Sequence, residues 1–165
     1  MTDPAQEPKK ENAVMIGIGE HCVGKNAMTS IGLGSCVALI LYDDSRKIGA
    51  MAHVMLPDSG GKDDRPGKYA DTAMKLLLPA LSPDPLHNRK ITAKLAGGAS
   101  MFEYFGKNLN IGERNVEALK KYLAEKKIRI VAEDVGGKVG RTVTFLPEEG
   151  GKVLIKRADG SCHEI

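Results

Sequence analysis

One cysteine of the chain follows a turn of small residues. Cys36 ends the segment GLGSC and is followed by the apolar run VALILYD. A thiolate is a strong nucleophile, but an unperturbed thiol has a pKa of about 8.5 and is mostly protonated at neutral pH. A lone cysteine beside a strand is most simply a small, inert hydrophobic residue. Catalysis therefore requires a base close to Cys36.

His53 is the base that the sequence offers. The segments 37–43 and 47–57 are rich in β-branched and aliphatic residues, and a short polar turn separates them, so they predict a β-hairpin. With the turn at 43–46, residues whose numbers sum to about 89 lie opposite each other, which places His53 opposite Cys36. Such neighbours have Cβ atoms about 4.5–5.5 Å apart. A slip of one residue would move one side chain to the other face.

Small and hydroxyl residues before Cys36 complete a catalytic set. Gly34 and Ser35 leave backbone N–H groups uncovered, and these can stabilise the oxyanion that develops in acyl transfer. Thr29 and Ser30 lie just upstream, and either hydroxyl can orient the imidazole of His53. The stretch thus predicts a nucleophile, a base, an orienting hydroxyl and an oxyanion hole.

Short apolar segments and two amphipathic ones must position these residues. Strands are predicted at residues 13–20, 37–43, 47–57, 90–100, 128–134, 141–147 and 152–158. One helix is predicted from Tyr69, with Pro79 kinking or ending it, and a second after Asn110, which is suited as its N-cap. This order predicts the α/β class: a layered α/β sandwich with mixed, largely antiparallel sheets and two main helices.

Composition bounds the class of protein. The chain has 165 residues with a net charge of +3, and the basic residues are scattered without interleaved aromatics, so we expect no nucleic-acid partner. Residues 1–12 are polar and predict a disordered tail, and residues 13–160 predict a single domain. The apolar runs are too short to insert into a membrane, and the N-terminus lacks a secretory signal, so we expect a cytoplasmic protein.

The remaining cysteines and histidines do not suggest a second site. The three cysteines and four histidines are widely spaced, so we expect neither a disulfide framework nor a metal site. His21 and Cys22 are adjacent and would point to opposite faces of a strand. Cys162 and His163 are expected to be exposed and without function in the C-terminal tail.

Four segments in order carry a resemblance to a known family. They are TSIGLGSCVALILYD, IGAMAHVMLPDSGGKDDRPGKYADTA, KLAGGASMF and NIGERNVEALKKYL. Over residues 14–157 the chain resembles the chemoreceptor glutamine deamidase family, CheD. The resemblance implies a Cys–His–Thr deamidase that needs no cofactor and converts glutamines on the cytoplasmic helices of methyl-accepting chemotaxis receptors to glutamates. Glutamate methyl esters could be cleaved by the same chemistry.

The resemblance also implies roles for particular residues. The family cysteine falls on Cys36 and the family histidine on His53. The position of the family threonine falls on Ser30, which keeps the hydroxyl, whereas Thr29 would serve only with a shifted backbone.

Around these residues, the long loop 58–69 is either a flexible lid or the frame of a groove for a helical substrate. In the second interpretation Lys62, Arg65 and Lys68 meet acidic groups of the receptor. Ser100, in GGASMF, is a further candidate to line the site.

Two alternatives to this deamidase differ in class. The first alternative, which the resemblance also implies, is a binding module that regulates a CheC-type phosphatase of the response regulator. In that case Cys36→Ala would leave the cellular role of the chain intact. A third hypothesis is a free-standing cysteine hydrolase of small amides, which activity on free glutamine would favour.

Overall fold

The computed structural model describes residues 12–100 and 110–165. All but the last residue of the predicted tail, and the end of the GGASMF segment, lie outside the described residues. Within the described residues, no helix is both long enough and apolar enough to cross a membrane.

Ten described strands form two five-stranded sheets, here called sheet A and sheet B. Sheet A contains, in spatial order, β1 (Val14–Met15), β3 (Met28–Leu33), β8 (Arg141–Leu146), β9 (Lys152–Arg157) and β10 (Cys162–Glu164). Sheet B contains β2 (His21–Gly24), β5 (Ile48–Val54), β4 (Val37–Asp43), β6 (Ile91–Gly97) and β7 (Arg129–Val135). The pairs β1–β3 and β6–β7 are parallel and the other pairs are antiparallel, which confirms the predicted mixed, largely antiparallel sheets.

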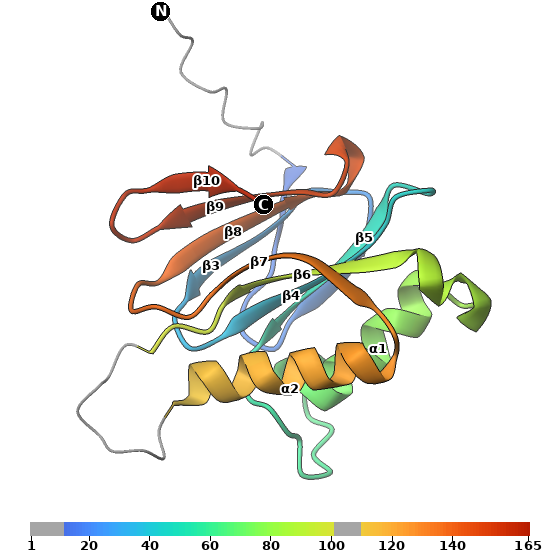
Figure 1. Ribbon diagram of the computed structural model, residues 1–165, viewed down its shortest axis with the longest axis horizontal. Coiled ribbons are helices and arrows are strands. Elements are labelled where there is room, and N and C mark those ends of the chain that lie inside the picture. The colour runs from blue at the N-terminus through green and yellow to red at the C-terminus, as the bar shows by residue number, and fades with distance from the viewer. Residues whose placement is uncertain (1–11, 101–109) are drawn as a thin grey trace, which may run out of the picture.

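The sheets and helices form three layers with sheet B in the middle (Figure 1). The helices α1 (Ala70–Leu81) and α2 (Ile111–Glu125) cover one face of sheet B, where they pack against alternate residues of β4 such as Leu39. The intervening residues of β4, such as Ile40, pack against sheet A around Phe145. All seven residues of β4 are therefore buried, which explains why its sequence is an unbroken apolar run.

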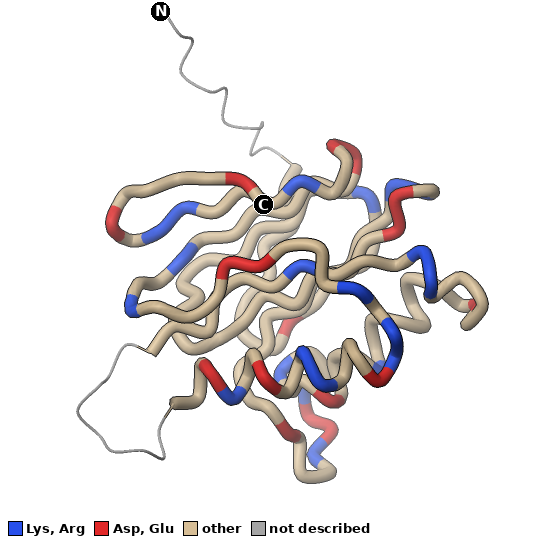
Figure 2. The backbone as a smooth tube through the Cα atoms, viewed as in Figure 1, with Lys and Arg blue, Asp and Glu red and all other residues tan. Residues whose placement is uncertain are grey.

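The two predicted helices are present, with short 3₁₀ helices in the connections. Asn110 caps α2 by accepting a 3.2 Å hydrogen bond from the Glu113 N–H, as predicted. Pro79 does not end α1, which continues to Leu81. The 3₁₀ segments are Pro66–Lys68, Pro85–Lys90 and Pro147–Glu149. Acidic and basic residues are interspersed along α2 and the loop before α1 (Figure 2), and they balance within each segment, so neither segment carries a net charge.

The N-terminal strands differ from the prediction. The strand expected at 13–20 is reduced to β1, because the chain turns at Gly19, whose φ is +77°. Two strands that were not predicted follow, β2 and β3. On β2, His21 is exposed while Cys22 packs against the core between the sheets, so the two side chains do face opposite ways.

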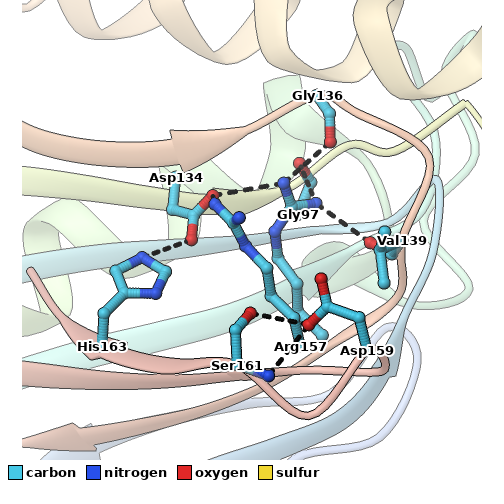
Figure 3. Close-up of polar contacts among 9 residues, drawn as sticks. Gly97, Asp134, Gly136, Val139, Arg157, Asp159, Ser161 and His163 are labelled. Carbon is cyan, nitrogen blue, oxygen red and sulfur yellow. Dashed lines mark hydrogen bonds and ion pairs between the residues drawn. The ribbon is translucent and has the colours of Figure 1, made fainter.

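A group of charged residues joins the two sheets (Figure 3). Asp134 on β7 of sheet B accepts hydrogen bonds from Arg141 on β8 at 3.2 Å and from Arg157 on β9 at 2.8 Å. His163 on β10 places Nε2 at 2.6 Å from the other carboxylate oxygen. The side chains of Asp134 and Arg141 are only 5% and 4% exposed, so the pair is buried.

This group adds to one prediction and sets the charge of Asp134. His163 is exposed, as expected, but its segment forms β10 rather than a loose tail, and His163 contacts a buried carboxylate. Burial acts to raise the pKa of Asp134. The hydrogen bond from Arg157 and the charges of Arg141, Arg157 and His163 outweigh it and hold the pKa below its usual value.

Candidate functional site

Ser30 and His53 meet between the two sheets. Ser30 lies on β3 of sheet A and His53 on β5 of sheet B, and both are buried. Ser30 Oγ is 2.7 Å from His53 Nδ1 and 2.7 Å from the backbone oxygen of Ile16. The contact therefore exists only because sheet A packs on sheet B.

The partners of Ser30 determine which nitrogen of His53 carries the proton. The Ile16 carbonyl can only accept a hydrogen bond, so the single hydroxyl hydrogen of Ser30 is donated to it. Ser30 Oγ then accepts from the Nδ1–H of His53. Nε2 keeps its lone pair, and it is buried without a hydrogen-bond partner in the described part of the chain. A nitrogen in this state is suited to act as a base.

His53 is held in its neutral form. Burial lowers its pKa, and this outweighs the opposite influence of the Ile16 carbonyl and the Glu20 carboxylate. Its backbone is paired on both sides: it lies opposite Ala38 of β4, and its own N–H donates to the Glu20 oxygen at 3.1 Å. The imidazole is thus neutral at neutral pH and fixed in position.

The register of the β4–β5 hairpin differs from the predicted one. Ala38, not Cys36, lies opposite His53, so paired residue numbers sum to 91 rather than 89. Because side chains alternate with a period of two, this shift of two residues leaves Cys36 on the same face as Ala38 and His53. Cys36 and Ala38 both belong to the core between the sheets. Cys36 is therefore a diagonal neighbour of His53, a position that lies within reach of longer side chains.

The backbone of Cys36 rests on the Gly-Gly bend after β6. The Gly98 N–H donates to the Cys36 oxygen at 2.8 Å, which extends the pairing of β4 with β6. A Cβ at Gly97, whose φ is +113°, would lie 2.3 Å from that oxygen. The bend is thus a site of close backbone packing. Burial raises the pKa of the Cys36 thiol, so the resting thiol is protonated.

The predicted oxyanion donors differ in availability. The Gly34 N–H donates to the Gly32 oxygen at 3.1 Å and is already engaged. The N–H groups of Ser35 and Cys36 make no hydrogen bond to any described residue. The backbone at Ser35 and Cys36 can therefore donate to a bound oxyanion.

Of the two upstream hydroxyls, only Ser30 contacts His53. Thr29 is the adjacent residue of β3 and so faces the other side of sheet A. Its Oγ1 is 3.2 Å from Oγ1 of Thr144 on β8.

The loop 58–69 is anchored next to His53. A Cβ at Gly67 would lie 2.6 Å from the Gly19 oxygen, and the Gly19 N–H donates to the His53 oxygen at 2.9 Å. Arg65 is exposed and donates to the Ile18 oxygen at 3.0 Å. Lys68 is half-buried, with Nζ 3.9 Å from the Asp64 carboxylate, and Lys62 is exposed.

Ser100 follows Ala99, whose N–H donates to the Gly34 oxygen at 2.8 Å. It is half-buried, and its N–H donates to the Gly137 oxygen at 2.9 Å. No hydrogen bond joins it to Cys36 or His53 among the described residues. Nor do the described residues gather three or more His, Cys, Asp or Glu side chains where they could hold a metal ion.

One buried residue of the site was missed by the sequence analysis. Asn115 of α2 donates to the backbone oxygens of Ser35 and Met55. The available signal was a polar residue directly before Val116 on the apolar face of an amphipathic helix.

Comparison with known proteins identifies the family. The family model described as CheD chemotactic sensory transduction matches residues 55–157. The chemoreceptor glutamine deamidase CheD of Thermotoga maritima is 53% identical over 148 residues, which cover 88% of this chain and 92% of that protein. Because this match covers 88% of the chain, it includes Ser30, Cys36 and His53 at whichever residue it begins.

Relatives from other organisms agree. The probable chemoreceptor glutamine deamidase CheD of Archaeoglobus fulgidus is 44% identical over 149 residues, 89% of this chain and 94% of that protein. The chemoreceptor glutamine deamidase CheD of Halalkalibacterium halodurans is 51% identical over 128 residues, 74% of this chain and 79% of that protein. Deamidation of glutamine, which these names state, is an amidohydrolase reaction. The chain belongs to the CheD family of chemotactic sensory transduction proteins.

Proposed function

We propose that this chain deamidates glutamine side chains on the cytoplasmic helices of chemotaxis receptors, with Cys36 as nucleophile, His53 as base and Ser30 as the residue that orients His53. The 2.7 Å contact between Ser30 and His53 Nδ1 carries the proposal, because it leaves Nε2 as the basic nitrogen on the face that Cys36 shares. The names of the relatives supply the substrate class.

The first half of the reaction forms a thioester. Nε2 of His53 takes the Sγ proton of Cys36, and the thiolate attacks the carboxamide carbon of the glutamine. The electron pair of the C=O bond moves to oxygen, where the Ser35 and Cys36 N–H groups stabilise the negative charge. When the tetrahedral intermediate collapses, the C–N bond breaks, and the imidazolium gives its proton to the nitrogen, which leaves as ammonia.

The second half releases glutamate. Neutral His53 takes a proton from water, and the resulting hydroxide attacks the thioester carbon. The C–S bond breaks, the thiolate regains its proton from the imidazolium, and the carboxylic acid ionises. Ser30 accepts from Nδ1–H throughout, so the ring keeps the orientation that both proton transfers need.

Mass spectrometry of a receptor cytoplasmic fragment tests the proposal. We expect incubation with the native chain to convert particular glutamines to glutamates and to release one ammonia for each. No conversion on any receptor fragment from the same cell would contradict the deamidase and would favour the role of regulating a CheC-type phosphatase. Conversion of free glutamine at a similar rate would favour a hydrolase of small amides.

Replacing Ser30 separates the orienting hydroxyl from the rest of the site. Ser30→Ala removes the acceptor for Nδ1–H, so we expect kcat to fall roughly 10- to 100-fold, less than the 10²- to 10⁴-fold that a general base contributes. Ser30→Thr keeps the hydroxyl and should restore most of the rate. Thr29→Ala is the matched control, since its hydroxyl contacts Thr144. Equal rates for Ser30→Ala and Thr29→Ala in a steady-state assay would refute the role.

The basic residues of the loop are proposed to contact the receptor. Lys62, Arg65 and Lys68 belong to the loop that packs beside His53, and opposite charges attract most at low ionic strength. We expect the triple alanine variant to raise KM severalfold at low salt with kcat within about twofold, and the difference to shrink at high salt. The control replaces three exposed lysines of the helical layer, Lys75, Lys121 and Lys126, which changes the net charge equally. An equal effect of both triple variants would attribute binding to net charge alone.

A further inference from the structure

Asn115 links the two segments that carry Cys36 and His53. It is fully buried in α2, and its Nδ2 donates to the Ser35 oxygen at 3.0 Å and to the Met55 oxygen at 2.9 Å. Ser35 directly precedes the cysteine, and Met55 follows the histidine by two residues. One carboxamide therefore holds the backbone on both sides of the reacting pair.

The chemistry of the contact requires an amide nitrogen. Both partners are carbonyl oxygens, which can only accept, and Nδ2 carries two hydrogens for them. An aspartate or a leucine of similar size has no such donor. The Oδ1 atom of Asn115 is buried and has no hydrogen-bond partner among the described residues, and an unpaired buried polar atom reduces stability. Any stabilisation that the Asn115 side chain provides therefore comes from the two hydrogen bonds that its Nδ2 donates.

The contact begins where the strand pairing ends. The last pair of β4 with β5 on this side is Val37 with Val54, so no ladder holds the next residues together. Asn115 bridges the two chains there. The start of α2 is itself locked in place, because a Cβ at Gly112 would lie 2.5 Å from the backbone oxygens of Gly98 and Ala99. Gly98 in turn bonds the Cys36 oxygen.

We propose that Asn115 is a positioning residue that sets the separation between the thiol of Cys36 and Nε2 of His53. The inference deepens the proposed function and rests on it for its catalytic meaning. Cys36 and His53 are diagonal neighbours, so the strand register alone leaves their separation adjustable. The carboxamide removes that freedom by fixing the ends of both strands.

The test measures the reactivity of the Cys36 thiol in the absence of substrate. In a Cys22→Ser, Cys162→Ser background, Cys36 is the only cysteine, and its rate of alkylation by iodoacetamide is measured against pH. Asn115→Ala should shift the midpoint of this profile upward, towards that of a thiol without a base, and should slow alkylation at neutral pH at least fivefold. With the receptor fragment, kcat should fall at least tenfold while KM stays within about twofold.

Two further variants separate positioning from stability. Leu119→Ala, in the same helix and buried away from the site, should lower the melting temperature and leave the alkylation profile unchanged. Asn115→Leu fills the same space and should shift the profile as Asn115→Ala does, which keeps the test valid if the alanine variant folds poorly.

An unshifted profile in a folded Asn115 variant would overturn the inference. Because no substrate is present, the alkylation profile tests the positioning role of Asn115 even if the native chain fails to deamidate receptors. Failure of the native chain in the receptor assay would instead contradict the proposed function.

Discussion

Replacing Cys36 with alanine is expected to abolish deamidation of a receptor fragment while leaving the protein folded. The substitution removes only the sulfur from a buried position at the end of a turn, so the cost in stability should be about 1 kcal/mol. Without the sulfur no thioester forms, and His53 alone has no nucleophile of comparable strength to activate. Loss of the nucleophile from a group of residues that act as a unit lowers kcat by at least about 10⁴-fold.

The other two cysteines are the controls for this result. Cys22 is half-buried on β2, and Cys162 is exposed on β10, and neither belongs to the contact between Ser30 and His53. Cys22→Ala and Cys162→Ala should therefore keep kcat within about twofold of the native value. If Cys36→Ala kept a tenth of the native rate by mass spectrometry, the thioester mechanism would be wrong.

Replacing Asp134 is expected to have the largest effect on stability. Asp134→Ala leaves Arg141 buried with three backbone carbonyls as its partners, and with no opposite charge beside it among the described residues. Breaking a buried ion pair by removing one partner costs about 3–5 kcal/mol. The free energy of unfolding of a small domain is about 5–15 kcal/mol, so the variant should lose a large part of its stability. Urea denaturation at neutral pH measures this loss.

His163 provides the comparison, and acid provides a second measurement. His163 is more exposed, at 37%, so His163→Gln should cost no more than about 1 kcal/mol. The pKa of Asp134 is lower in the folded protein than in the unfolded chain, so its stabilisation is present above the unfolded value of about 3.9 and is lost as the pH falls through the folded value. Asp134→Asn should lack this part of the acid dependence. An Asp134→Ala variant no less stable than His163→Gln would show that the group does not join the sheets.

Several elements could be predicted because their signals are local. The run 37–43 is apolar at every position since both of its faces are buried, and Asn110 caps α2 through a contact three residues away. Cys36 and His53 could be placed near each other from the sequence because a single predicted hairpin connects them. The error of two residues in the register preserved the face of each side chain, so Cys36 and His53 share a face as diagonal neighbours, although they are not directly opposite as predicted.

Other features depend on contacts between distant parts of the chain. Ser30 reaches His53 only where sheet A packs on sheet B, and β3 was not predicted as a strand. Asp134 contacts His163 through the same packing of sheets, and the sequence alone indicated only an exposed tail there.

Sequence by itself thus predicted a nucleophile and a base, and it determined the class of fold, because residue type and short-range periodicity are local properties of the chain. Tertiary structure decided which hydroxyl contacts His53, which ring nitrogen keeps its lone pair, and that Asn115 bonds the backbone beside both Cys36 and His53. These choices follow from the packing of two sheets and a helix, whose contacting residues lie tens of positions apart in the chain.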